Sequence, residues 1–118
     1  MDIREKCMTA GIDYDGGVER FVGQPDLFLH FLKEFVSDTT MKELEEALNE
    51  GNIKTAFETS HTLKGVVGNL SLTKLYNAIV PLVDCLRKEG NISEARLLYR
   101  DVEKEYNDII FFIKNNIR

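Results

Sequence analysis

Apolar residues recur at three- and four-residue spacing along most of the chain, which is the pattern of amphipathic helices. The pattern predicts two short helices and four long ones, over residues 1–10, 18–22, 25–36, 52–68, 71–88 and 92–115. No stretch alternates polar and apolar residues strongly enough to indicate a strand. We therefore expect an all-α fold.

Turn and capping residues mark where the predicted helices begin and end. Residues 40–43 have the Thr-x-x-Glu form of a capping box, which predicts the start of one further helix. Glu-Gly-Asn-Ile occurs twice, at 50–53 and 89–92. In each copy we expect glycine to close one helix in the left-handed conformation and asparagine to cap the next. Pro81 lies inside a helical pattern and predicts a kink or a break near Ala78.

Short turns between long amphipathic helices place neighbouring helices antiparallel. We expect an antiparallel up-and-down four-helix bundle with short additional N-terminal helices. Its four members are predicted to begin at Pro25, Asn52, Ser71 and Asn91, and the helix beginning at Thr40 is either a short link or one of the four. With 118 residues the chain is large enough to bury one core. Residues 1–118 are therefore predicted to form a single, free-standing domain.

Composition excludes several classes of partner. The formal net charge is -5 and no basic block stands out, which disfavours a nucleic-acid partner. No apolar run is long enough to cross a bilayer, and the N-terminus lacks the apolar core of a signal peptide. Cys7 and Cys85 lie far apart without metal-type spacing. We expect reduced thiols in a cytoplasmic protein.

The helix predicted over 52–68 carries two neighbouring stripes of side chains. The inward one consists of Phe57, Ser60, Leu63, Val67 and Leu70. The second contains His61, Lys64, Gly65 and Gly68, which share a face because residues three and four apart are neighbours on a helix. A glycine inside a helix costs about 1 kcal/mol relative to alanine, so two glycines on one stripe indicate that another backbone or a ligand comes close. The second stripe predicts a shallow, exposed site for an anion.

A lone histidine beside an apolar stripe is by default a partly buried, hydrogen-bonded side chain. Lys64 one turn on and the glycines at 65 and 68 argue against that alternative for His61. A neutral imidazole is also a nucleophile that forms covalent intermediates. Lys64 is a suitable point charge for a phosphoryl group on that ring. The chain has no nucleotide-binding loop, no His-Glu-x-x-His pair and no candidate triad. Glu58 and His61 form one Glu-x-x-His motif, but a bundle metal site needs two, so we expect no metal and only half of a site.

The run His-Thr-Leu-Lys-Gly at 61–65, followed by Asn-Leu at 69–70, resembles the signature of histidine-containing phosphotransfer (HPt) domains of bacterial-type phosphorelays. Residues 11–35 resemble the opening of that family, so the likeness extends over about residues 11–115. It implies a helical bundle whose exposed histidine accepts a phosphoryl group from the aspartyl phosphate of a receiver domain. It also implies reversible transfer to another receiver without nucleotide or other cofactor, by a carrier rather than an enzyme.

Carried over to this chain, the resemblance makes His61 the phosphorylated residue, with Lys64 helping to hold the phosphate. Gly65 would leave room for the phosphoryl group and for the approaching receiver. Gly68 and Glu58 are candidates for partner docking.

The resemblance implies response-regulator receiver domains as partners, leaves a hybrid sensor histidine kinase open, and implies a monomer. Ser71 stands where the family commonly has a glycine. A second hypothesis is a binding-only module that docks receiver or kinase domains without moving a phosphoryl group. The presence of both His61 and Lys64 favours the carrier, because a docking module needs neither.

Overall fold

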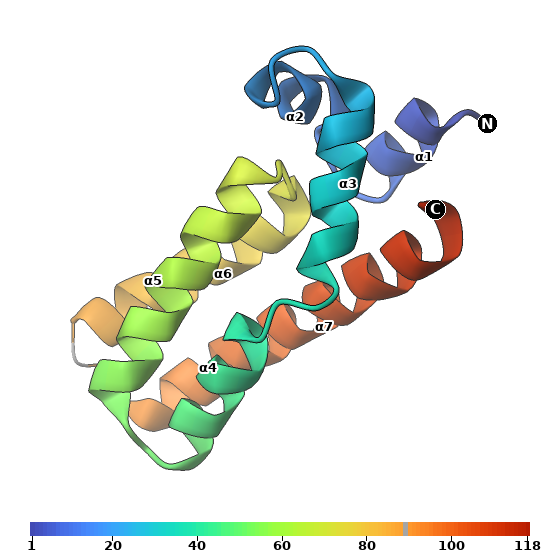
Figure 1. Cartoon of the computed structure of the whole chain (residues 1–118). Coiled ribbons are helices and arrows are strands. Elements are labelled where there is room, and N and C mark those ends of the chain that lie inside the picture. Colours follow the sequence, from blue (N-terminus) through green and yellow to red (C-terminus); the bar gives the residue numbers. More distant parts are fainter. Residues whose placement is uncertain (89) are drawn as a thin grey trace.

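The computed structural model describes residues 1–88 and 90–118, which fold into seven helices and contain no strand (Figure 1). The helices are α1 (Ile3–Thr9), α2 (Tyr14–Arg20), α3 (Pro25–Phe35), α4 (Thr40–Asn49), α5 (Ile53–Asn69), α6 (Thr73–Arg87) and α7 (Ile92–Asn116). The prediction of an all-α helical bundle is confirmed. Glu89, in the second predicted Glu-Gly-Asn-Ile turn, lies outside the described residues.

Helices α4, α5, α6 and α7 pack in chain order, and α4 also contacts α7. Two individual contacts show that α3 and α4 run antiparallel to α7. The Phe35 ring at the end of α3 lies 5.8 Å from the Tyr106 ring of α7, and the Leu48 carbonyl near the end of α4 accepts a hydrogen bond from Arg96 at 2.9 Å. Helices α3 and α4 therefore follow one another along α7, so the helix that begins at Thr40 is a member of the bundle and not a mere link. Figure 1 shows α1, α2 and the start of α3 at the end of the bundle where α7 finishes.

The core is apolar and draws on all of the helices from α3 to α7. Its largest fully buried side chains are Phe28, Ile12, Leu32, Leu44, Leu63, Leu72, Leu75, Ile79, Leu82, Leu86, Ile109 and Ile113. Most of them lie on the inner faces that the three- and four-residue spacing predicts. Burying each of these side chains contributes about 1.5–3 kcal/mol relative to exposure, so the bundle is stabilised chiefly by this interior.

The two Glu-Gly-Asn-Ile turns differ in the role of their glycine. Gly51 has a φ of 71°, as predicted, and the Asn52 side chain caps α5. Asn91 likewise caps α7 by accepting a hydrogen bond from the Ser93 N–H at 2.7 Å. The φ angle of Gly90 depends on Glu89, so its predicted left-handed conformation lies outside the described residues. A Cβ at this position would lie 2.9 Å from the Cys85 carbonyl oxygen, so the glycine serves a close approach of two backbone segments.

The predicted start of a helix at Thr40 is confirmed, whereas its predicted capping box and a break in the helix at Pro81 are not observed. No capping box forms at residues 40–43, because the Asp38 carboxylate accepts the hydrogen bond of the Thr40 N–H at 2.8 Å and begins α4. Helix α6 continues through Pro81 without a break near Ala78. Pro81 is exposed, whereas its neighbour Leu82 is fully buried. Packing of the inner face of α6 therefore outweighs the loss of one backbone hydrogen bond.

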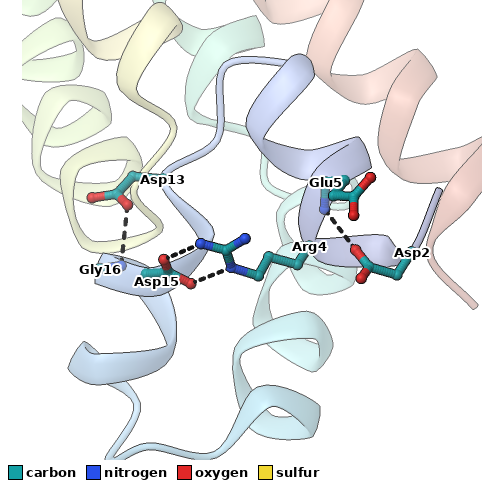
Figure 2. A network of polar contacts seen from close by, with 6 residues as sticks. All are labelled: Asp2, Arg4, Glu5, Asp13, Asp15 and Gly16. Carbon is teal, nitrogen blue, oxygen red and sulfur yellow. Dashed lines mark hydrogen bonds and ion pairs between the residues drawn. The ribbon is translucent and has the colours of Figure 1, made fainter.

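A polar network holds the N-terminal helices in place (Figure 2). Asp2 and Asp13 accept hydrogen bonds from the backbone N–H groups of Glu5 and Gly16, in the first turns of α1 and α2. The Arg4 guanidinium donates to both carboxylate oxygens of Asp15, at 2.9 and 2.7 Å. This hydrogen bonding lowers the pKa of the Asp15 carboxyl below its ordinary value. The ion pair fixes α1 against the start of α2.

The segment around α2 is in turn attached to the turn between α5 and α6. The Asp13 N–H donates to the Ser71 carbonyl at 2.8 Å, and the Arg20 guanidinium donates to the Gly68 carbonyl and to the Ser71 hydroxyl. Ser71 has a φ of 57°, in the left-handed region that favours glycine. These contacts fix the end of α5, the helix that carries His61.

The two cysteines are free thiols. Cys7 is fully buried, and burial raises its pKa to about 11, so it stays protonated at neutral pH. Cys85 is partly buried, and burial raises its pKa as well. Both thiols therefore stay protonated near neutral pH and serve as packing side chains.

Gly17→Ala is expected to lower the free energy of unfolding by about 1–3 kcal/mol, the usual cost of overpacking a core. A Cβ at residue 17 would lie 2.3 Å from the ring of Phe28, which is fully buried and has no room to move. Urea denaturation monitored by circular dichroism measures the change. Gly65→Ala is the matched control, because nothing lies within 4 Å of its added Cβ and it should stabilise the protein slightly. Equal stabilities for the two variants would contradict the packing described for α2 and α3.

Candidate functional site

Helix α5 separates a buried face from a solvent-facing one. Its buried residues are Ala56, Ser60, Leu63 and Val67. The predicted inward stripe is confirmed at Ser60, Leu63, Val67 and Leu70, all of which are buried. Phe57 differs, because it is only partly buried and its ring lies beside His61. The buried inner face therefore anchors α5 to the core, and the outer face stays exposed to solvent.

The His61 side chain is exposed on the outer face of α5. The Phe57 ring meets it edge to face, with ring centroids 5.8 Å apart and an interplanar angle of 69°. Within residues 1–88 and 90–118 the imidazole has no hydrogen-bond partner. A buried, hydrogen-bonded histidine does not describe this geometry. The Phe57 ring covers one side of the imidazole and leaves the imidazole nitrogens accessible.

Lys64 follows His61 by one turn and is partly buried. Its Nζ lies 6.0 Å from the centroid of the Tyr76 ring on α6. No carboxylate of the described residues lies within ion-pair distance of this ammonium. The charge of Lys64 is therefore available to an anion beside His61.

The two glycines of the predicted stripe have different surroundings. A Cβ built on Gly65 would meet no atom within 4 Å, so this position opens onto free space next to His61. A Cβ on Gly68 would lie 3.4 Å from the Tyr76 ring. The ring of Tyr76 thus occupies the space beside Gly68, whereas the space beside Gly65 is empty.

Glu58 lies on the exposed face, one turn before His61. Its backbone carbonyl accepts a hydrogen bond from the Thr62 hydroxyl at 3.0 Å. Its carboxylate takes part in no hydrogen bond or ion pair of the described residues. Glu58 thus adds a negative charge to the rim of the site without touching the imidazole.

An apolar groove of about 330 Å³ separates α3 from the C-terminal half of α5. It is lined by Phe21, Phe31, Glu34, Phe35, Asp38, Val66, Asn69 and Leu70. The rings of Phe21 and Phe31 stack with centroids 5.1 Å apart, and Phe31 remains 41% exposed. The groove therefore offers apolar surface on the side of α5 that faces α3.

Three residues shape this region in ways that the sequence did not indicate. Phe57 was predicted as an inner position, and Tyr76 has the helical spacing of one in the segment 71–88. Both are partly buried and contact the exposed stripe of α5. Arg20 holds the end of α5 from a distance of 48 residues in sequence. For Tyr76 and Phe57 the sequence offered one signal, an aromatic side chain at the edge of an apolar stripe. For Arg20 it offered none.

No cluster of three or more His, Cys, Asp or Glu in the described part of the chain has an arrangement that would hold a metal ion. None of the helices in that part combines the length and the apolar character that a membrane span requires.

The family model of the Hpt domain matches residues 27–110, from the start of α3 to within α7. The match covers well over half of the chain, and the chain belongs to the Hpt domain family. No curated protein and no solved structure matches it. Membership gives the protein a phosphotransfer-related role in two-component signalling, where Hpt domains are phosphocarrier modules that interact with receiver or kinase components.

Proposed function

We propose that this protein is a phosphorelay intermediate that accepts a phosphoryl group on His61 from the aspartyl phosphate of a receiver domain and passes it to another receiver. The observation that carries the proposal is the exposed imidazole of His61 on α5, next to the open space at Gly65. The ammonium of Lys64 one turn away supports it, because it matches the charge of a phosphoryl group.

The transfer forms one bond and breaks another. A ring nitrogen of His61 attacks the phosphorus of the aspartyl phosphate, the N–P bond forms, and the P–O bond to the receiver breaks with departure of the aspartate carboxylate. The reverse sequence on a second receiver regenerates the imidazole. Because an imidazole and one ammonium supply neither a metal nor a general base, the receiver completes the site. The protein then acts as a carrier and not as an enzyme.

The receiver would dock over the outer face of α5. Gly65 leaves room for its approach, and the apolar groove beside α3 supplies surface for contact. Glu58 would lie at the rim of this interface. Gly68 is a weaker docking candidate than Gly65, because the Tyr76 ring already fills the space beside it.

A transfer assay tests the proposal against the binding-only hypothesis. A receiver carrying labelled aspartyl phosphate is mixed with the protein, and acid-labile label on each partner is followed over time. A second, unlabelled receiver is then added. We expect label to move to the protein and onward to the second receiver. Stable complex formation with several receivers and no label on the protein would favour the docking module instead.

Lys64→Ala is expected to slow phosphoryl uptake by about ten- to a hundredfold, because a hydrogen bond to a charged group contributes about 1.5–3 kcal/mol. The fold should persist, since Lys64 is not part of the core. Rapid-quench kinetics measures the rate, and thermal melting checks the fold. A protein that melts at room temperature, or transfers at the wild-type rate, would contradict this assignment.

Four properties accompany the proposal and stay predictions. The partners are receiver domains, one of which would belong to a hybrid sensor histidine kinase if the relay starts there. The protein works as a monomer and as a single domain over residues 1–118. Its location is the cytoplasm.

A further inference from the structure

Tyr76 stands out because its ring is directed from α6 toward the exposed stripe of α5. It is partly buried, and its face lies 6.0 Å from the Lys64 ammonium. A cation at this distance from a tyrosine ring is attracted by the negative face of the ring. Since no carboxylate of residues 1–88 and 90–118 pairs with Lys64, the ring is the group that attracts this ammonium.

The Tyr76 ring packs beside Gly68 of α5. A Cβ on Gly68 would lie 3.4 Å from Cε2 and 3.6 Å from Cδ2 of Tyr76, so the ring rests against the glycine. A side chain longer than a methyl group at residue 68 would push the ring away. The second glycine of the stripe therefore accommodates Tyr76 and, through it, affects Lys64.

We propose that Tyr76 is a positioning residue that holds the Lys64 ammonium on the side of α5 that faces α6, one turn from His61. This role rests on the phosphotransfer proposed above. A free lysine side chain samples many rotamers, and binding an anion requires it to give up that freedom. Over the ring of Tyr76 the lysine side chain is already restricted, so it loses less conformational entropy when the phosphoryl group binds.

The same contact keeps a second region clear. Residues 64 and 68 lie on the side of α5 that faces Tyr76 of α6, whereas the space beside Gly65 is open. By drawing the ammonium toward α6, Tyr76 keeps the long lysine side chain out of that opening. The receiver can then approach His61 without first displacing Lys64.

A double-mutant cycle tests the role of Tyr76. Phosphoryl uptake is measured for wild type, Tyr76→Leu, Tyr76→Phe, Lys64→Ala and the variant combining Tyr76→Leu with Lys64→Ala. We expect Tyr76→Leu to slow uptake about threefold, the size of an exposed cation–π contact. Tyr76→Phe keeps the ring face and should react at nearly the wild-type rate. In the Lys64→Ala background, Tyr76→Leu should have no further effect.

An equal slowing by Tyr76→Leu in both backgrounds would mean that the tyrosine is only a packing residue, and no slowing in either would equally overturn the proposal. Proton NMR gives a readout that is independent of transfer. The ring current of Tyr76 should shift the ε-methylene protons of Lys64 upfield in wild type and in Tyr76→Phe, and the shift should vanish in Tyr76→Leu. If wild type accepts no phosphoryl group, the proposed function fails. If it does and Tyr76→Leu reacts normally, only the positioning role fails.

Discussion

His61→Gln is expected to abolish acid-labile phosphate on the protein while leaving the bundle folded. Glutamine is close to histidine in size, suits a helix and cannot form a phosphoramidate. The side chain it replaces is exposed and makes only one ring contact, so its loss should change stability by less than about 1 kcal/mol. Autoradiography after incubation with a labelled receiver measures the phosphate, and circular dichroism measures the fold.

The chain contains its own matched control for this substitution. His30 is the only other histidine, it is also exposed on a helix, and it lies 3.6 Å from the Glu34 carboxylate. Its ring is therefore beside a negative charge, which repels a phosphoryl group. His30→Gln should take up label at the wild-type rate. Loss of label in His30→Gln with retention in His61→Gln would reverse the assignment of the two histidines.

Gly65→Gln is expected to reduce phosphoryl uptake by about a hundredfold or more while the protein becomes slightly more stable. The added side chain enters the open space beside His61 and keeps the reacting atoms of the receiver apart. Displacements of about 1 Å already cost about a hundredfold in such reactions. Glutamine also favours the helix over glycine by about 0.5–1 kcal/mol. Uptake kinetics and urea denaturation measure the two effects.

Gly65→Ala separates steric blockage from any structural need for glycine. Its Cβ meets nothing within 4 Å, so it should stabilise α5 in a similar way and impair uptake much less than the longer side chain. If both variants transfer as fast as wild type, the opening is not used. If both unfold, the glycine is needed for the fold and not for access.

Features that depend on local spacing could be predicted from the sequence. The inner and outer faces of α5 follow from the three- and four-residue rule, which placed His61, Lys64 and Gly65 together on one exposed stripe. The asparagine caps at Asn52 and Asn91 are local as well, because each side chain bonds the turn that follows it.

Features that depend on long-range packing could not be predicted. The left-handed Ser71 is held by the Arg20 guanidinium of α2, which is 51 residues away in sequence. The continuity of α6 through Pro81 is another case, because buried neighbours on the inner face override a local helix breaker. In each case the deciding contact lies outside the pattern that the sequence displays.

The reactive groups of the candidate site could be predicted from the sequence, but the residues that support them could not. Helical spacing gives no information about which residues of α6 face α5, so the contact between Tyr76 and Lys64 appears only in three dimensions. The same holds for the packing of the Tyr76 ring beside Gly68. Supporting residues of this kind belong to a neighbouring helix.

Locating the phosphate on the wild-type protein tests the central proposal most directly. After incubation with a phosphorylated receiver, the protein is digested with trypsin at neutral pH and the peptide spanning residues 55–64 is sequenced by tandem mass spectrometry. The peptide also contains serine and threonine hydroxyls, so acid treatment of a second aliquot distinguishes a phosphoramidate from a phosphate ester. We predict an acid-labile phosphoryl group on His61. Phosphate on a hydroxyl, on His30, or on no residue of a protein that still binds the receiver would contradict the proposal.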